Sequence, residues 1–292
     1  MSPRKLPIAW LYLLAAVLAA GATEQRPPRS NADLPGDANQ FVREVVQHEL
    51  DADAADHTHW RYRFHKETED TAQDRDVIET KEGSLARTLL INGQPLTPDQ
   101  RSKDDARMKQ LVDDAGERAK RDRRAKQDTD KANELLRAIP DAFIFHYDGM
   151  DGPLTRLVFS PNPRYSPPTH ELMVYHAMAG RLWVDRSSLR LAMIEGQLTE
   201  EVRFAWGLLG HLDKGGTFKV VRKNVGDNHW DTVSLDVNMQ GRIVLFKSLS
   251  VKEKEVLTDY HRMPDDLTMA RALEMLQGGS SSVSSSRPST RN

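Results

Sequence analysis

The sequence predicts a mainly β, α+β fold: a curved antiparallel sheet or half-barrel of about nine to ten strands, with short helices on the concave face and one long charged helical insertion. Three observations predict this class. Segments with a residue period of two, typical of half-buried strands, recur over most of the chain. Turn-forming residues separate these segments at short intervals, which favours antiparallel neighbours. Residues 97–139 instead combine dense charge of both signs with apolar residues at helical spacing.

The first part of the chain is predicted to form a helix followed by a three-stranded meander. Apolar residues lie at helical spacing between Asn39 and Leu50. In the next segment aromatic side chains alternate with basic ones, so one face of the strand is apolar. Two further strands follow, and they end at Asn92-Gly93, a strong turn dipeptide. The predicted strands are His57–His65, Asp76–Lys81 and Ser84–Ile91.

The charged insertion, residues 97–139, is predicted to be one long exposed helix or two helices. Thr97 is a suitable N-cap and Pro98 a suitable first helical residue. The apolar stripe of this segment is interrupted by a very polar stretch from Lys120 to Asp130. Asp122, Asp128 and Asp130 neutralise the basic residues there, and the formal net charge of the chain is -2, so nucleic acid is not expected as a partner.

Strands return after the insertion and continue to residue 247. A short helix, His170–Met178, is predicted behind Thr169, and a last short helix covers Leu267–Leu276. The predicted strands are Ala142–Tyr147, Leu154–Ser160, Arg181–Asp185, Leu189–Leu198, Val202–Leu209, Thr217–Lys223, Trp230–Met239 and Arg242–Lys247.

The N-terminal segment predicts export. Arg4 and Lys5 precede an apolar run from Ile8 to Ala20, and Ala20-Gly21-Ala22 presents small residues to a signal peptidase. The run is short for a membrane span, so no span is expected after cleavage; a retained N-terminal anchor is the alternative. The predicted organisation is a signal peptide (1–22), a flexible linker (23–38), a single curved-sheet domain (39–277) containing the insertion, and a disordered Ser-rich tail (278–292).

A hairpin in the second half of the chain resembles a known family. Gly180-Arg181-Leu182-Trp183-Val184-Asp185 and the return strand Leu189–Gly196 enclose a short acidic turn. Together with the order of elements over residues 57–275, this hairpin resembles the periplasmic lipoprotein-carrier and outer-membrane lipoprotein-sorting proteins. The resemblance implies a half-barrel with helices plugging a hydrophobic cavity, and a periplasmic location. This chain is longer than those proteins, less apolar, and differs from them in its charged insertion.

Several kinds of chemistry find no support in the residues present. The chain has no cysteine, which excludes disulfides, thiolate metal sites and a catalytic thiol. It contains neither a Gly-x-Ser-x-Gly elbow nor a P-loop. His170-Glu171 begins like a zinc-hydrolase helix, but Val174 occupies the position that needs the second histidine. We therefore predict no enzyme activity, no catalytic residue, no metal and no cofactor.

Large apolar side chains on most of the predicted strands favour a ligand cavity. On a curled sheet they would share the concave face, either as a filled core or as a cavity suited to an acyl chain. The leading hypothesis is a non-catalytic envelope protein, periplasmic or secreted, that binds a lipid, an acyl chain or a lipoprotein beneath the helix Thr169–Met178. The predicted cavity residues are Trp60, Tyr62, Phe64, Phe145, Phe159, Trp183, Phe204 and Trp206.

Two other functions remain open from the sequence. The charged helix 97–139 could serve an envelope protein–protein interaction or a structural module, with the sheet as a scaffold only. A metal-dependent enzyme is the third hypothesis, because His57 and His59 lie on the same face of a strand and His65 lies further along that face.

Overall fold

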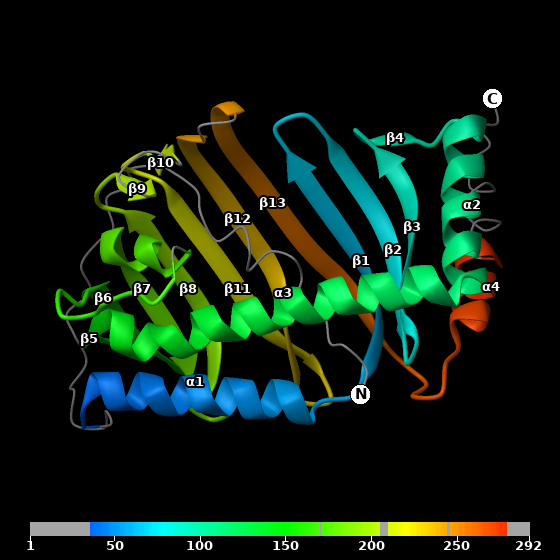
Figure 1. The fold of residues 1–292 in the computed structure, drawn as a ribbon. Coiled ribbons are helices and arrows are strands. Elements are labelled where there is room, and N and C mark those ends of the chain that lie inside the picture. The colour runs from blue at the N-terminus through cyan, green and yellow to red at the C-terminus, as the bar shows by residue number, and fades with distance from the viewer. Residues whose placement is uncertain (1–35, 170, 205–209, 244–245, 279–292) are drawn as a thin grey trace, which may run out of the picture.

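The computed structural model describes residues 36–278 except 170, 205–209 and 244–245 (Figure 1). Over these residues the protein is mainly β, with one large antiparallel sheet, open at both edges, and several helices. The mainly β class predicted from the sequence is therefore confirmed. The predicted signal peptide, the C-terminal tail beyond Gly278 and most of the predicted linker lie outside the described residues. None of the described helices is long and apolar enough to cross a membrane.

Within the described residues, four α-helices and one 3-10 helix accompany the sheet. Their bounds are α1 (Ala38–Ala55), α2 (Pro98–Asp113), α3 (Ala115–Ala142), η3 (Glu171–Ala177) and α4 (Met269–Gly278).

In the part of the chain that the structure describes, thirteen strands form the sheet, and eleven of them follow the order β4-β3-β2-β1-β13-β12-β11-β8-β7-β6-β5. The short strands β9 and β10 pair with each other, and β10 also pairs with β12. The bounds are β1 (His59–Thr68), β2 (Ala72–Thr80), β3 (Gly83–Ile91), β4 (Gln94–Pro95), β5 (Phe143–Asp151), β6 (Leu154–Pro161), β7 (Met178–Asp185), β8 (Arg190–Leu198), β9 (Val202–Phe204), β10 (Gly210–Leu212), β11 (Thr217–Gly226), β12 (His229–Ile243) and β13 (Phe246–Met263).

The predicted insertion connects the two edges of the sheet. Strand β4 lies at one edge and β5 at the other, and the chain passes between them through α2 and α3. Helix α3 has 28 residues and is therefore about 42 Å long. Eleven neighbouring strands span about 48 Å, so one helix of this length can cross the sheet. Figure 1 shows α3 crossing one face of the sheet with α1 alongside it; we call this side the helix-covered face.

Local sequence determines where the two helices of this connection begin and end. The Thr97 hydroxyl accepts from the Gln100 N–H, the Gln100 side chain accepts from the Thr97 N–H, and Pro98 is the first helical residue, which together make a capping box. Asp114 then ends α2 and caps α3 by accepting from the Glu117 N–H at 3.0 Å. The sequence predicted either one long helix or two helices for this segment, and the structure has two.

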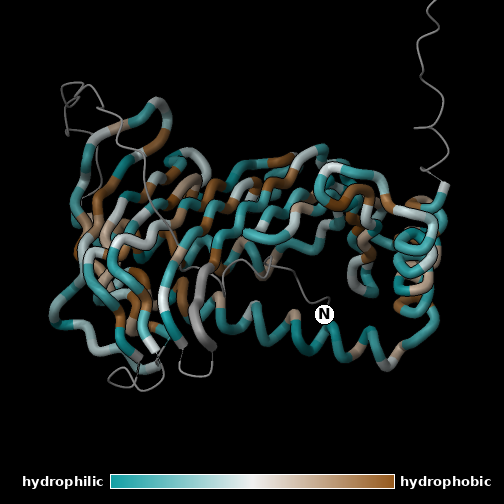
Figure 2. Tube along the Cα trace, turned by 90° about the horizontal axis from the view of Figure 1, so that it is seen from above, coloured by the Kyte–Doolittle hydropathy of each residue, from teal (hydrophilic) through white to brown (hydrophobic). Residues whose placement is uncertain are grey.

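Two separate cores hold the molecule together. The main core packs α1 and the C-terminal part of α3 against β5–β8, β11 and β12, and it also includes η3. The smaller core packs α2 and α4 against the outer strands β2 and β3, through residues such as Met108 and Leu111. Seen from above, apolar segments gather in the strands, whereas α3 is hydrophilic over most of its length (Figure 2). The insertion contributes to both cores and is therefore not a detachable appendage.

The predicted strand count of nine to ten was too low. Strands β4 and β10 have only two and three residues, which is too short to show a period. The last predicted strand, Arg242–Lys247, ends close to the beginning of β13. Strand β13 has 18 residues and continues to Met263. Its inward positions include Glu253 and Glu255, which interrupt the apolar alternation expected of a half-buried strand.

Candidate ligand cavity

The eight predicted cavity residues do not lie together. Phe145 and Phe159 pack within the main core, in a cluster of aromatic rings. Trp60 is buried and stacks on the His229 ring at 5.2 Å. Trp183 lies in sequence between two residues of the main core, so it points to the opposite face of the sheet, where its Nε1 donates to Asp151.

Tyr62 and Phe64, by contrast, line a cavity of about 640 Å³. Trp206 and the side chain of Phe204 lie outside what the structure describes.

The cavity lies between α3 and the part of the sheet formed by β1, β2, β3 and β13. Helices α2 and α4 contribute Leu111 and Met269 at one end. Its other lining residues are Tyr62, Phe64, Lys66, Arg75, Val77, Glu82, Gly83, Ser84, Ala86, Arg118, Arg121, Asp122, Arg124, Ala125, Asp128, Glu255 and Leu257. Its volume falls within the range of about 300–1,000 Å³ that is usual for small-molecule sites.

Helix α3 covers this cavity without packing into it. Its buried residues are all in the C-terminal part, beginning at Ala132, where the helix joins the main core. Residues 115–131 contain no buried residue. The very polar stretch noted in the sequence, Lys120–Asp130, is thus the part of the helix that bridges the space between the two cores.

The pairing of the strands places the side chains of the cavity floor in rows, and successive rows change from apolar to polar. Residues paired across neighbouring strands put their side chains on the same face. The row at the apolar end contains Tyr62 and Val77, with Ala86 beside Val77 on β3. The next row contains Phe64, with Arg75 on one side and Leu257 on the other.

The third row is polar. Lys66 lies between Gln73 and Glu255. The floor therefore has an apolar end towards α2 and α4 and a polar end at Lys66.

The polar end contains a buried charge cluster. Lys66 Nζ lies 2.7 Å from a carboxylate oxygen of Glu253 and 3.1 Å from Oε1 of Glu255. Burial raises the pKa of Glu255, with a further contribution from Glu253, although Lys66 acts in the opposite direction. Glu255 is only 3% exposed, and its Oε2 has no hydrogen-bond partner among the described residues. A buried carboxylate oxygen without a donor is costly, so it marks a place where a ligand donor would be favourable.

Arginines from α3 and β2 also line the cavity. Arg118 donates to the carbonyls of Leu111 and Val112 and so satisfies the C-terminus of α2. The other arginines on the cavity wall, Arg75, Arg121 and Arg124, have no salt bridge to any carboxylate of the described residues.

Burial, together with the neighbouring positive charge of Arg107, lowers the pKa of Arg75 and of Arg121. The positive charges of these side chains are only partly compensated by nearby carboxylates.

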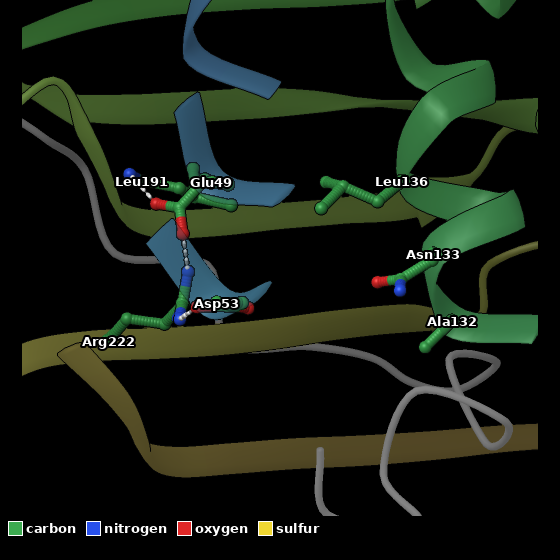
Figure 3. A pocket seen from close by; sticks show the side chains of 7 residues that line it. All are labelled: Glu49, Asp53, Ala132, Asn133, Leu136, Leu191 and Arg222. Carbon is green, nitrogen blue, oxygen red and sulfur yellow. Dashed lines mark hydrogen bonds and ion pairs between the residues drawn. The ribbon is translucent and has the colours of Figure 1, made fainter. Parts of the chain in front are cut away.

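A second, much smaller pocket lies under α1 and has a structural role (Figure 3). Glu49 of α1 is completely buried and pairs with Arg190 of β8 at 2.9 Å and with Arg222 of β11. Glu49 also accepts from the Leu191 N–H, and Asp53 lies 3.1 Å from Arg190. The pocket volume of about 10 Å³ has room for about one water molecule.

Among the described residues, the segment expected to form the helix Thr169–Met178 does not line the cavity of about 640 Å³. The segment Glu171–Ala177 is a 3-10 helix, and its residues Leu172, Val174 and Tyr175 are buried in the main core. The Tyr175 hydroxyl donates to the Leu135 carbonyl at 3.1 Å, which ties this segment to α3. The described part of this segment thus belongs to the main core, whereas the cavity is lined chiefly by residues of β1, β2, β3, β13, α2, α3 and α4.

Over the residues that the structure describes, the histidines of the first strand do not fall in a group of histidine and acidic side chains close enough to share a cation. His57 is exposed, and His65 Nδ1 lies 2.8 Å from Asp74, across β1 and β2. Within the described part of the chain, the side chains close enough together to share a cation are Glu201, His211 and Asp213, which lie near β9 and β10.

Protein-family models and curated proteins give no match to this sequence. The cavity is therefore interpreted from its own geometry. The sequence prediction missed its polar residues, because the predicted first strand ended at His65 and no strand was predicted over residues 248–263, where Glu253 and Glu255 lie. The signal that could have found them is the period of two through Val251, Glu253, Glu255 and Leu257.

Proposed function

We propose that this protein is a non-catalytic, exported envelope protein that binds a lipid, an acyl chain or an acylated peptide in the cavity beneath α3. The observation that carries the proposal is a cavity of about 640 Å³ with an apolar floor at one end and charged groups at the other. Burying an acyl chain there is favourable by about 0.8 kcal/mol for each methylene group removed from water.

The covering helix supports the same proposal. Because residues 115–131 of α3 contain no buried residue, this part of the helix can move from the sheet without exposing a buried apolar side chain of its own. A ligand can thus enter while the two cores keep the rest of the fold together. The export part of the proposal rests on the N-terminal sequence alone.

The test is direct binding of a neutral dodecyl probe carrying a fluorophore to the full-length protein from an exporting host. Native mass spectrometry before and after organic extraction reports any lipid that copurifies. We expect one bound chain per molecule. Ala125 faces the cavity from α3, so Ala125→Trp should fill part of the space and weaken probe binding at least about tenfold, which corresponds to about 1.4 kcal/mol.

The matched control is Ala119→Trp, which places the same side chain at an exposed position of the same helix outside the cavity lining. It should leave binding unchanged. Failure of the unmodified protein to bind the probe would overturn the proposal, as would equal effects of the two tryptophan variants.

A further inference from the structure

Resting on the proposed function, we infer that the ligand is a single-chain amphiphile with an anionic headgroup that also carries a hydroxyl donor. Arg75 and Arg121 would bind the anion, and Oε2 of Glu255 would accept from the hydroxyl. The chain would lie along the apolar end of the floor towards Leu111 and Met269.

The distribution of charge around the cavity supports an anion. Five cationic side chains and four carboxylates line it, but these charges are not equally available. Lys66 is neutralised by its two glutamates, and Arg118 is bonded to the end of α2. Of the lining carboxylates, Glu82 accepts from the Met269 N–H at 2.7 Å.

Arg75 and Arg121 face the cavity from opposite walls, one on β2 and one on α3. Each lies close enough to Arg107 for that positive charge to lower its pKa, and neither has a salt bridge with a described carboxylate. Arg107 itself is paired with Asp104 at 2.7 Å. A phosphate or carboxylate between the two walls would accept hydrogen bonds from these guanidinium groups.

Oε2 of Glu255, which lacks a hydrogen-bond partner among the described residues, supports a hydroxyl donor on the ligand. Glu255 is buried, its Oε1 is occupied by Lys66, and its Oε2 has no partner among the described residues. Glu255 lies in the row of the cavity floor next to the row that contains Arg75. A headgroup bound to Arg75 therefore brings a neighbouring hydroxyl within reach of this acceptor, whereas a bare anion does not use it.

Calorimetric titration of the full-length protein with three matched probes tests the inference. Lauroyl-lysophosphatidic acid carries the chain, the phosphate and a hydroxyl. Monolauroylglycerol lacks the phosphate, and glycerol 3-phosphate lacks the chain. We expect the first to bind at least tenfold more tightly than either of the others, and its affinity to fall as the salt concentration rises.

Substitutions then assign the headgroup contacts. Arg75→Gln and Arg121→Gln should each weaken lysophosphatidic acid binding about tenfold and leave monolauroylglycerol binding unchanged. Arg123→Gln, at an exposed position of α3 outside the cavity lining, is the matched control and should change neither affinity. Glu255→Gln should weaken lysophosphatidic acid severalfold but leave dodecyl phosphate, which has no hydroxyl, unaffected.

The outcomes separate this inference from the proposed function. Equal affinities for monolauroylglycerol and lysophosphatidic acid would overturn the anionic headgroup and keep the acyl-binding cavity. Equal affinities for glycerol 3-phosphate and lysophosphatidic acid would show an anion site without a role for the chain, which overturns both. Binding of none of the three probes overturns the proposed function itself.

Discussion

Glu49 shows how a single residue can tie a helix to the sheet. Its carboxylate is completely buried and receives hydrogen bonds from Arg222 and from the Leu191 N–H, with Arg190 at 2.9 Å. The pairing leaves no net charge between Glu49, Asp53 and the two arginines. Such a group adds little compared with an apolar core, but removing one member leaves an uncompensated buried charge.

Truncating Glu49 should therefore be strongly destabilising. We expect Glu49→Ala to lower the free energy of unfolding by about 3–5 kcal/mol, because two arginines lose their partner. Urea denaturation measures this change. Glu44→Ala, at an exposed position of the same helix, should change it by less than about 0.5 kcal/mol. Similar losses in the two variants would contradict a structural role for the network.

The same carboxylate should make stability depend on pH. Burial favours the neutral acid, but Arg222, Arg190 and the Leu191 N–H outweigh it and hold the pKa of Glu49 below its usual value of 4.5. A lowered folded-state pKa adds stability above the unfolded value, and this contribution is lost as pH falls through the folded-state pKa. Below pH 4.5 we expect the unfolding free energy to fall more steeply in the unmodified protein than in Glu49→Gln. Parallel curves in a pH series of urea denaturations would refute this.

Among the elements, α3 combines two different environments in one continuous helix. Its C-terminal part is anchored in the main core through Leu136 and Ile139, whereas residues 115–131 cover the cavity. Surface ion pairs such as Lys126 with Asp130 support this stretch, but exposed pairs contribute only about 0.3–0.5 kcal/mol each. The stability of the helix should thus differ along its length.

Hydrogen exchange should reveal that difference. Amides in residues 119–131 should exchange faster than those in residues 132–142, because the first stretch contributes no buried side chain of its own to a core. Mass spectrometry of peptic fragments resolves the two parts. A bound lauroyl chain should slow exchange in the first stretch and leave the second unchanged. Uniform exchange along α3 in the absence of ligand would show that the covering part is held as firmly as the anchored part.

On the scale of the whole molecule, one sheet joins the two cores. Strand β1 follows the first helix, yet it pairs with β13, the last strand of the chain, over most of its length. Strands β1 and β13 therefore connect the smaller core, with α2 and α4, to the main core. This continuity predicts that the two cores unfold together.

A pair of truncations in the two cores tests this cooperativity. Met108 and Leu157 are both fully buried, one in each core. Met108→Ala and Leu157→Ala should each cost about 2–5 kcal/mol and should shift the same single transition in thermal and urea unfolding. A separate early transition in Met108→Ala would show that the smaller core unfolds independently.

The sequence by itself determined the mainly β class, most strand positions and the capped start of α2. These depend on local patterns: a period of two, turn residues, and Thr97 with Pro98 and Gln100. The alternation in β1 was likewise correct, because Tyr62, Phe64 and Lys66 do share one face.

Only the tertiary structure decided where the cavity lies and what lines it. The pairing of β1 with β13 joins residues almost 200 positions apart, a separation about which a local period carries no information. That pairing brings Glu255 beside Lys66, and the crossing of α3 places Arg121 on the same cavity as Arg75. Polar residues at inward positions of β13 break the apolar pattern by which a strand is recognised in a sequence. The same residues form the polar end of the cavity, where the core is left unfilled.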